Sequence, residues 1–254
     1  MPSSFHNQHL PGELTDPQGA SVADAFLKDS TYRIRGISRD PSKASSRVWS
    51  DKGVEMVAGD LNDVDSLKSA FKGANVIFGV TDFWQATNDP ANFERAAKEG
   101  RTINELCYDI EVQQGKNIVD AAASTVETLD RFVLSTLSHA RKWSNGKITW
   151  NFHFDAKWAA VEYLRATYPE LNKKTSLVQV ALFVTNWKME ESMAPQKVCR
   201  TACYIVHTTD NYSNPMALTS FDCLLSRTHQ FPWSNRGEIR VSALLLGALY
   251  SVLC

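Results

Sequence analysis

The sequence lacks the cysteine patterns that build disulfide frameworks and zinc sites. Its five cysteines are odd in number and include no Cys-x-x-Cys pair. They are Cys107, Cys199, Cys203, Cys223 and Cys254. Disulfide-rich secreted domains and structural zinc sites both need paired or clustered cysteines. The cysteine content therefore argues against both, predicts no metal site and favours a reducing compartment.

An excess of charge of either sign is also missing. Lys and Arg total 27 and Asp and Glu total 28, so the formal net charge is −1. Proteins that bind nucleic acids or acidic membranes directly tend to carry a basic surface or segment. The charge balance therefore predicts no direct binding to nucleic acid or membrane.

A leader and a long hydrophobic run are missing too. The opening residues, MPSSFHNQHLPGELTDP, have no basic start followed by an apolar stretch, as a signal peptide would. The most apolar stretch, residues 241–254, is too short to cross a bilayer and suits a terminal core strand or helix. These features predict a cytoplasmic protein, with a nuclear location as the alternative for a regulator.

The sequence does have the composition of a globular protein, and segments that resemble strands alternate with segments that resemble helices. Hydrophobic residues make up 43% of the chain and charged residues 22%. From Gly19 to about Phe183, short β-branched runs alternate with helical segments, which predicts βαβ units and a parallel sheet. The predicted strands are 32–38, 54–58, 75–81, 131–135 and 177–183, and the predicted helices are 21–28, 42–52, 64–72, 92–124 and 153–168. Beyond about Gln196 the pattern fails and predicts no fold.

Single residues mark where several helices should begin or end. Asp63 can accept hydrogen bonds from first-turn amides, so it is expected to cap the helix that follows. Gly53 and Gly73 can end the helices before them in a left-handed conformation. The long helix 92–124 is expected to break near Gly100.

Several runs of residues form a combination typical of one family. The longest, at residues 32–84, is YRIRGISRDPSKASSRVWSDKGVEMVAGDLNDVDSLKSAFKGANVIFGVTDFW. It is followed by QGKNIVDAAA at 114–123, RFVLSTLS at 131–138, HFDAKWAAVEYLR at 153–165 and FVTNW at 183–187. Together they resemble the NmrA-like family, an atypical branch of the short-chain dehydrogenases, over about residues 18–190. The resemblance implies a Rossmann-like, doubly wound parallel sheet at 19–190, between an irregular segment 1–18 and a divergent segment 191–254 of unknown fold.

The resemblance also implies a dinucleotide across the carboxyl ends of the strands. The residues implied to contact it are Gly19, Arg39, Lys43, Asp60, Leu61, Val80, Thr81 and Lys157. Arg39 matches the position that faces the adenosine ribose, where a guanidinium can grip a 2′-phosphate. This favours NADP, with NAD as the alternative. Arg39 can also be a solvated surface arginine, and Asp60 can instead cap the segment from Asn62.

The implied catalytic residues centre on His153 and Lys157. Short-chain dehydrogenases place a tyrosine four residues before a lysine, and here His153 stands in the tyrosine position. By resemblance, Lys157 would hold the ribose, His153 would donate a proton, and Ser135 or Thr136 would polarise a carbonyl. The alternative for His153 is a helix-face residue partly buried against the sheet.

One part of the family pattern is missing. An apolar strand and a GxxGxxG turn should precede the first helix, whereas residues 9–19 are HLPGELTDPQG. Asp16 stands at or beside the middle glycine, and Pro17 has no backbone N–H to offer a phosphate. The departure predicts a sheet without its first strand, open ladder edges on the two neighbouring strands and weakened cofactor binding.

Three hypotheses about function follow. The first, implied by the resemblance, is an NAD(P)-dependent oxidoreductase acting on a small molecule in fungal secondary metabolism. The second is a non-catalytic, NADP-sensing co-regulator that binds a protein partner such as a GATA-type transcription factor. The third is a truncated, non-functional product, favoured by the departure near the amino end.

Overall fold

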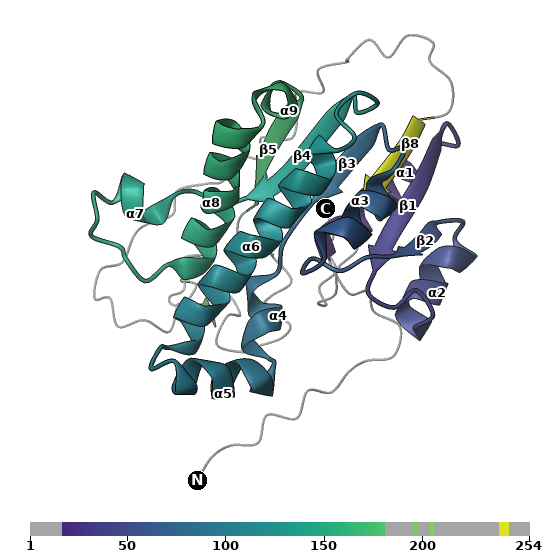
Figure 1. The fold of residues 1–254 in the computed structure, drawn as a ribbon. Helices are drawn as coiled ribbons and strands as arrows, with labels where there is room; N and C mark the ends of the chain where they lie inside the picture. The colour runs from purple at the N-terminus through teal and green to yellow at the C-terminus, as the bar shows by residue number, and fades with distance from the viewer. Residues whose placement is uncertain (1–16, 181–195, 198–203, 206–238, 244–254) are drawn as a thin grey trace. The chain divides into compact units, whose positions relative to one another are not determined.

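The computed structural model describes residues 17–180, 196–197, 204–205 and 239–243, and its main feature is a six-stranded sheet (Figure 1). The strands stand in the order β2-β1-β8-β3-β4-β5, and all neighbours are parallel. They are β1 (Tyr32–Ser38), β2 (Glu55–Ala58), β3 (Val76–Gly79), β4 (Arg131–Thr136), β5 (Thr175–Gln179) and β8 (Ile239–Ala243). The predicted α/β fold with a parallel sheet is confirmed.

Strand β8 comes from the C-terminal part of the chain and lies between β1 and β3, as Figure 1 shows in yellow. Residues 239–243 pair with residues 32–36 of β1, and residues 241–243 pair with residues 76–78 of β3. With β8 counted as the first strand, the order is 3-2-1-4-5-6, that of the doubly wound nucleotide-binding fold. The prediction of open edges on the two neighbours is therefore wrong, because a strand remote in sequence supplies both ladders.

Helices cover both faces of the sheet, as the crossovers between parallel strands require. They are α1 (Pro17–Phe26), α2 (Ala44–Asp51), α3 (Val64–Phe71), α4 (Phe83–Thr87), α5 (Pro90–Lys98), α6 (Ile103–Ala123), α7 (Ala140–Trp143), α8 (Phe152–Thr167) and α9 (Pro169–Lys173). Ile37 of β1 packs with side chains of α3, α6 and α8, whereas Ile34 packs with those of α1 and α2. Because alternate residues of a strand point to opposite faces, these two clusters are the two layers of the core.

The local signals in the sequence act where they were expected. The Asp63 carboxylate accepts hydrogen bonds from the N–H groups of Asp65 and Ser66 at the start of α3. Gly53 and Gly73 follow α2 and α3 with φ of 94° and 74°. The predicted helix 92–124 breaks at Gly100, where φ is 65°, into α5 and α6. These predictions are confirmed because each depends on a few consecutive residues.

Helices α6 and α8 approach each other closely, which positions the candidate site described below. A Cβ atom added to Gly115 of α6 would lie 2.6 Å from the Cβ of Ala160 in α8. Real Cβ atoms do not tolerate so short a contact, so glycine permits this packing. The approach brings together polar side chains of α6 and α8 that lie far apart in the sequence.

The chain divides into two compact units. The first comprises Met1–Phe183 and Glu238–Cys254, and the second comprises Val184–Gly237. The second unit contains the antiparallel pair β6 (Gln196–Lys197) and β7 (Tyr204–Ile205). The predicted C-terminal segment 191–254 is thus shared between the two units, since β8 belongs to the sheet of the first.

Some expectations concern residues outside the described part of the chain. Cys107 is described, and it is buried and free. Outside the described residues lie Asp16, Cys199, Cys203, Cys223 and Cys254. Among the described residues, no group of three or more His, Cys, Asp and Glu side chains could hold a metal ion. Within the same part of the chain, no helix combines the length and the apolar character that a membrane crossing needs.

Candidate functional site

The residues predicted to contact a cofactor lie where strands of the sheet end. Arg39 directly follows β1, Asp60 lies two residues beyond β2, and Thr81 lies two residues beyond β3. The carboxyl ends of parallel strands meet at one edge of a sheet, and ligands of doubly wound folds bind outside this edge. The structure therefore gathers these three residues at one place, which we call the carboxyl edge.

The amino end of α1 is tied to the same edge through Gln18. Ser135, the next-to-last residue of β4, donates a hydrogen bond from Oγ to Gln18 Oε1 at 2.6 Å. Ser135 is only 4% exposed, and Gly19, next to Gln18, is buried as well. Gln18 was not among the predicted site residues, because a bond between residues 117 positions apart leaves no local signal in the sequence.

The turn after β1 carries two exposed cations, Arg39 and Lys43. Asp40 orders this turn by accepting hydrogen bonds from Ser42 Oγ at 2.6 Å and Ser42 N at 2.9 Å. These two bonds hold the pKa of the Asp40 carboxyl below its usual range. The arrangement presents a guanidinium and an ammonium group to solvent beside the carboxyl edge, where they could meet an anionic ligand.

Hydrogen bonds within the turn after β2, and one from α6, hold this turn in place. Asp60 Oδ1 accepts from the backbone N–H of Asn62 at 2.9 Å and from its side-chain amide at 3.1 Å. Leu61 is buried, and its carbonyl accepts from Asn117 Nδ2 of α6 at 2.7 Å. The alternative for Asp60, a cap of the segment from Asn62, agrees with its bond to the Asn62 N–H, whereas the helix α3 itself is capped by Asp63. Contact of Asp60 or Leu61 with a cofactor stays a prediction.

Lys157 of α8 joins Thr81 and Glu111 in a buried cluster. Its Nζ donates to the Thr81 carbonyl at 2.6 Å, to Thr81 Oγ1 at 2.9 Å and to Glu111 Oε1 at 2.5 Å. An ammonium group has three N–H donors, so these bonds use all of them. In this arrangement Lys157 ties α8 to α6 and to the end of β3, and it must give up one of these bonds to hold a ribose hydroxyl.

Glu111 is the main residue of the site that the sequence did not reveal. Its side chain is 1% exposed, and its Oε1 also accepts from Thr81 Oγ1 at 2.7 Å. Burial raises the pKa of this carboxyl, while the charge of Lys157 acts in the opposite direction. Fully buried helix positions are mostly apolar, so a glutamate in the core implies a buried partner. Only the fold identifies that partner as Lys157.

Val80 and His153 complete the site beside Thr81. Val80 directly follows β3 and is 5% exposed, so it belongs to the core. The His153 ring lies 4.9 Å from that of Phe154 and 5.2 Å from that of Trp84, measured between centroids. Burial, followed by the charge of Lys157, lowers the pKa of His153 to about 4. At neutral pH the imidazole is therefore uncharged, as expected of a partly buried helix-face residue and not of a protonated acid.

The pKa of His153 leads to a testable dependence of stability on pH. Since folding lowers this pKa from 6.5 to about 4, the unfolded chain binds more protons than the folded chain between these values. The free energy of unfolding is therefore unaffected by the protonation of His153 above about pH 6.5. It falls as the pH is lowered towards 4, because protonation of this imidazole then favours the unfolded chain. We expect wild type to lose about 2 kcal/mol more than His153→Phe across this range in urea unfolding, less than the full shift would give because the ring is only partly buried. Equal losses would show that His153 is not buried in its neutral form.

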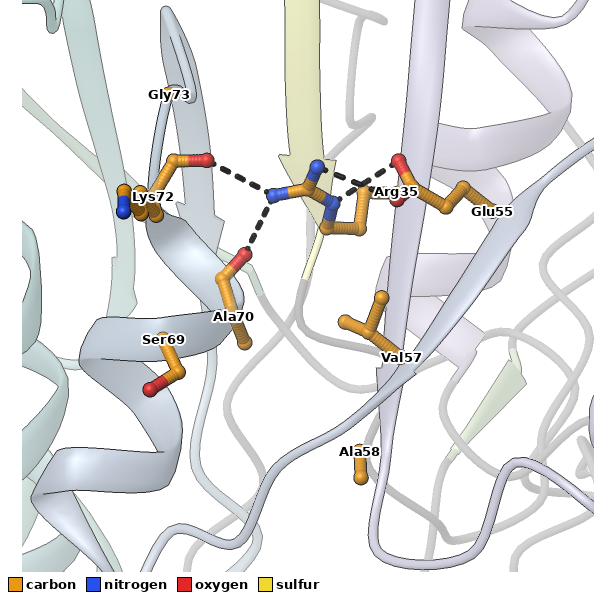
Figure 2. Close-up of a pocket in the computed structure, with 8 residues that line it drawn as sticks. All are labelled: Arg35, Glu55, Val57, Ala58, Ser69, Ala70, Lys72 and Gly73. Carbon is orange, nitrogen blue, oxygen red and sulfur yellow. Dashed lines mark hydrogen bonds and ion pairs between the residues drawn. The ribbon is translucent and has the colours of Figure 1, made fainter.

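A pocket of about 560 Å³ lies elsewhere, between β2 and the end of α3 (Figure 2). The Arg35 guanidinium binds the Glu55 carboxylate and the carbonyls of Ala70 and Lys72 there. The volume would suit a small molecule. However, the guanidinium joins β1, β2 and α3, and none of the predicted site residues lines the pocket. We assign this pocket a structural role.

Comparison with known proteins gives one family and several fungal relatives. The model of the NmrA-like family matches residues 15–208. The NmrA-like family domain-containing oxidoreductase lnbB of Aspergillus flavus is 30% identical over 155 residues, covering 60% of this chain and 41% of that protein. The oxidoreductase hkm9 of Aspergillus hancockii is 29% identical over 134 residues, covering 53% and 35%. The chain thus spans about two fifths or less of the length of these relatives.

Solved structures with a similar arrangement include a regulator and a reductase. The negative transcriptional regulator Nmra is 18% identical, with 68% of this chain and 44% of that chain covered and a TM-score of 0.49. The Citrobacter sp. triphenylmethane reductase complexed with NADP(H) is 17% identical, with 67% and 48% covered and a TM-score of 0.44. Both TM-scores lie below 0.5, so these likenesses carry no argument about the site.

Proposed function

This chain belongs to the NmrA-like family, and from that membership we propose that it binds NADP at the carboxyl edge and acts as an oxidoreductase on a small molecule. NAD is the alternative cofactor. The curated relatives that it matches are named oxidoreductases and come from fungi. We place the reaction in fungal secondary metabolism, as the family resemblance implies. Because the chain spans only 41% of the first relative, the activity of the whole protein is part of the proposal.

The position of β8 is the observation that carries the proposal. It completes the doubly wound strand order, so that the order reverses between β8 and β3. Ligands of doubly wound sheets bind outside the carboxyl ends of the strands at such a reversal. Thr81 follows one of these strands, and Gln18 and Ser135 meet at the same edge. This strand order supports a dinucleotide site at the carboxyl edge, although the glycine motif typical of the family is missing from the sequence.

The residues at the adenosine end fit a 2′-phosphate. Arg39 and Lys43 are exposed on the turn after β1, the second strand of the doubly wound order. A guanidinium can bind a phosphate through two N–H groups, and the ammonium adds charge nearby. At the pyrophosphate end Pro17 begins α1 and offers no N–H, so we expect weaker binding there. Reduced NADP, when bound, supplies a hydride, and the residues of this chain hold and orient it.

Titration with NADPH and NADH tests the proposal. We expect calorimetry on the purified chain to show saturable binding that prefers NADPH. Arg39→Ala should weaken NADPH binding at least about tenfold, because a charge-assisted hydrogen bond contributes roughly 1.5–3 kcal/mol. NADH binding should change little, since NADH has no 2′-phosphate.

A matched control is available at the opposite edge of the sheet. Arg131 begins β4 and lies at the amino ends of the strands, so Arg131→Ala should leave NADPH binding unchanged. If both variants lose the same NADPH affinity, Arg39 affects binding through the stability of the fold or the net charge of the protein, and not through a contact with the 2′-phosphate. No binding of either nucleotide to the wild-type chain would remove the proposal.

A non-catalytic co-regulator is the second candidate. The observation that favours it is that each predicted catalytic group is engaged or uncharged: Ser135 bonds Gln18, Lys157 bonds Glu111 and Thr81, and the pKa of His153 is about 4. A sensor would bind NADPH without oxidising it in the presence of carbonyl or imine substrates. It would also bind a protein partner, such as a GATA-type transcription factor, differently with and without nucleotide. NADPH oxidation that stops in Lys157→Ala would instead favour the oxidoreductase.

A further inference from the structure

Two carboxyl groups and one ammonium group lie near the end of β3. The side chains of Glu111 and Lys157 are 1% and 12% exposed and are joined by an ion pair. Asp82, which is half-buried, directly follows Thr81, whose carbonyl accepts from Lys157 Nζ. Asp82 is the N-cap residue before α4, and its Oδ1 accepts from the backbone N–H groups of Trp84 and Gln85. We call Asp82, Glu111 and Lys157 the buried charge cluster.

Each carboxyl group of the cluster has one oxygen that accepts no hydrogen bond from any described residue. Within the part of the chain that the structure describes, Glu111 Oε2 and Asp82 Oδ2 are both buried and have no hydrogen-bond partner, although the other oxygen of each group accepts two hydrogen bonds. A buried carboxylate oxygen without a donor is costly, and protonation removes the charge that makes it so. The two bare oxygens therefore mark a place where a proton is favoured.

The charge balance of the cluster leads to the same conclusion. With both carboxyls ionised, one positive charge faces two negative charges, and buried charges are stable only when they are paired. A single proton on either carboxyl makes the cluster neutral. Burial raises the pKa of Asp82 and of Glu111, and Asp82 raises that of Glu111 further, while Lys157 opposes the shift in both.

The neighbouring titratable groups do not alter this balance. His153 lies one turn before Lys157 on α8, and its pKa of about 4 leaves it neutral at pH 7. Cys107 lies one turn before Glu111 on α6, and burial raises its pKa, so its thiol stays protonated. Neither residue adds a charge to the cluster at neutral pH.

We infer that Asp82 and Glu111 together bind one proton at neutral pH and store it beside Lys157 at the carboxyl edge. Because the two carboxyls interact, the proton belongs to the pair and not to one residue. The storage requires no cofactor. Its use rests on the oxidoreductase proposed above: reduced NADP would supply a hydride to a carbonyl carbon, and Lys157 would give the carbonyl oxygen a proton. The stored proton then restores the ammonium group. This source replaces His153, whose imidazole is uncharged at neutral pH.

Infrared spectroscopy of the full chain in D₂O tests the storage directly. A protonated carboxyl group has a C=O stretch distinct from that of a carboxylate. We expect this band in wild type at pH 7 and its loss as the pH is raised well above neutrality, a measurement that needs no variant. Glu111→Gln and Asp82→Asn should each abolish the band at pH 7, because Lys157 then neutralises the single carboxylate that remains. Glu170→Gln, at an exposed ion pair with Lys173, should leave it unchanged.

The possible outcomes separate the storage from the proposed function. Absence of the band from wild type at pH 7, or its persistence in either amide variant, would overturn the shared proton. A band that behaves as expected in a chain that binds no NADPH would support the storage and remove only its proposed use. Both amide variants keep the size of the side chain, and folding is checked by cooperative thermal unfolding of each.

Discussion

Val241→Pro in β8 is expected to lower the free energy of unfolding by at least about 3 kcal/mol. Residue 241 pairs with Ile34 of β1 on one side and with Val76 of β3 on the other. Proline has no N–H for the ladder, and its ring disfavours a central strand position. A loss of this size corresponds to a fall in Tm of roughly 6–12 °C for a chain of this length. Thermal and urea unfolding measure it.

Val241→Thr is the matched control, because it keeps the backbone N–H and a β-branched side chain. Its Tm should lie much closer to that of wild type than the Tm of the proline variant. If Val241→Pro unfolds at the wild-type temperature, β8 does not stand between β1 and β3. The framework on which the proposed NADP site depends would then be lost as well.

Lys157→Met should produce the second large effect: it should lower the free energy of unfolding by about 3–5 kcal/mol at neutral pH. The substitution leaves Glu111 and Thr81 in the core without the ammonium group that they bind. Since the carboxyl pair can take up a second proton, the loss should shrink as the pH is lowered and grow as it is raised. Urea unfolding at several pH values measures this dependence.

Lys173→Met provides the comparison for a lysine outside the core. Its ion pair with Glu170 is exposed, with 69% and 74% of the two side chains accessible, and such pairs contribute at most about 1 kcal/mol. A loss in Lys157→Met no larger than in Lys173→Met, or one that does not vary with pH, would contradict the buried charge cluster.

Some residues of the candidate site could be predicted from neighbouring sequence, whereas others are brought together only by tertiary packing. The cations on the turn after β1 and the polar turn after β2 could be placed from sequence, because each directly follows a strand that the sequence predicts. The partner of Ser135 could not be placed, since Gln18 lies 117 positions away. The same holds for Lys157 and Glu111, which are 46 positions apart and meet only because α6 and α8 pack closely at Gly115.

The sequence by itself determined the elements that depend on neighbouring residues: the alternation of strands and helices, the Asp63 cap, and the breaks at Gly53, Gly73 and Gly100. It also determined the family, through runs that stay within single elements. Only the tertiary structure decided which strand stands between β1 and β3. An apolar run near the end of the chain suits a strand or a helix equally, and its choice depends on backbone hydrogen bonds to residues about two hundred positions away. Tertiary packing likewise decided that a glutamate, an aspartate and a lysine share one buried site, because burial and pairing of charge are properties of the folded chain.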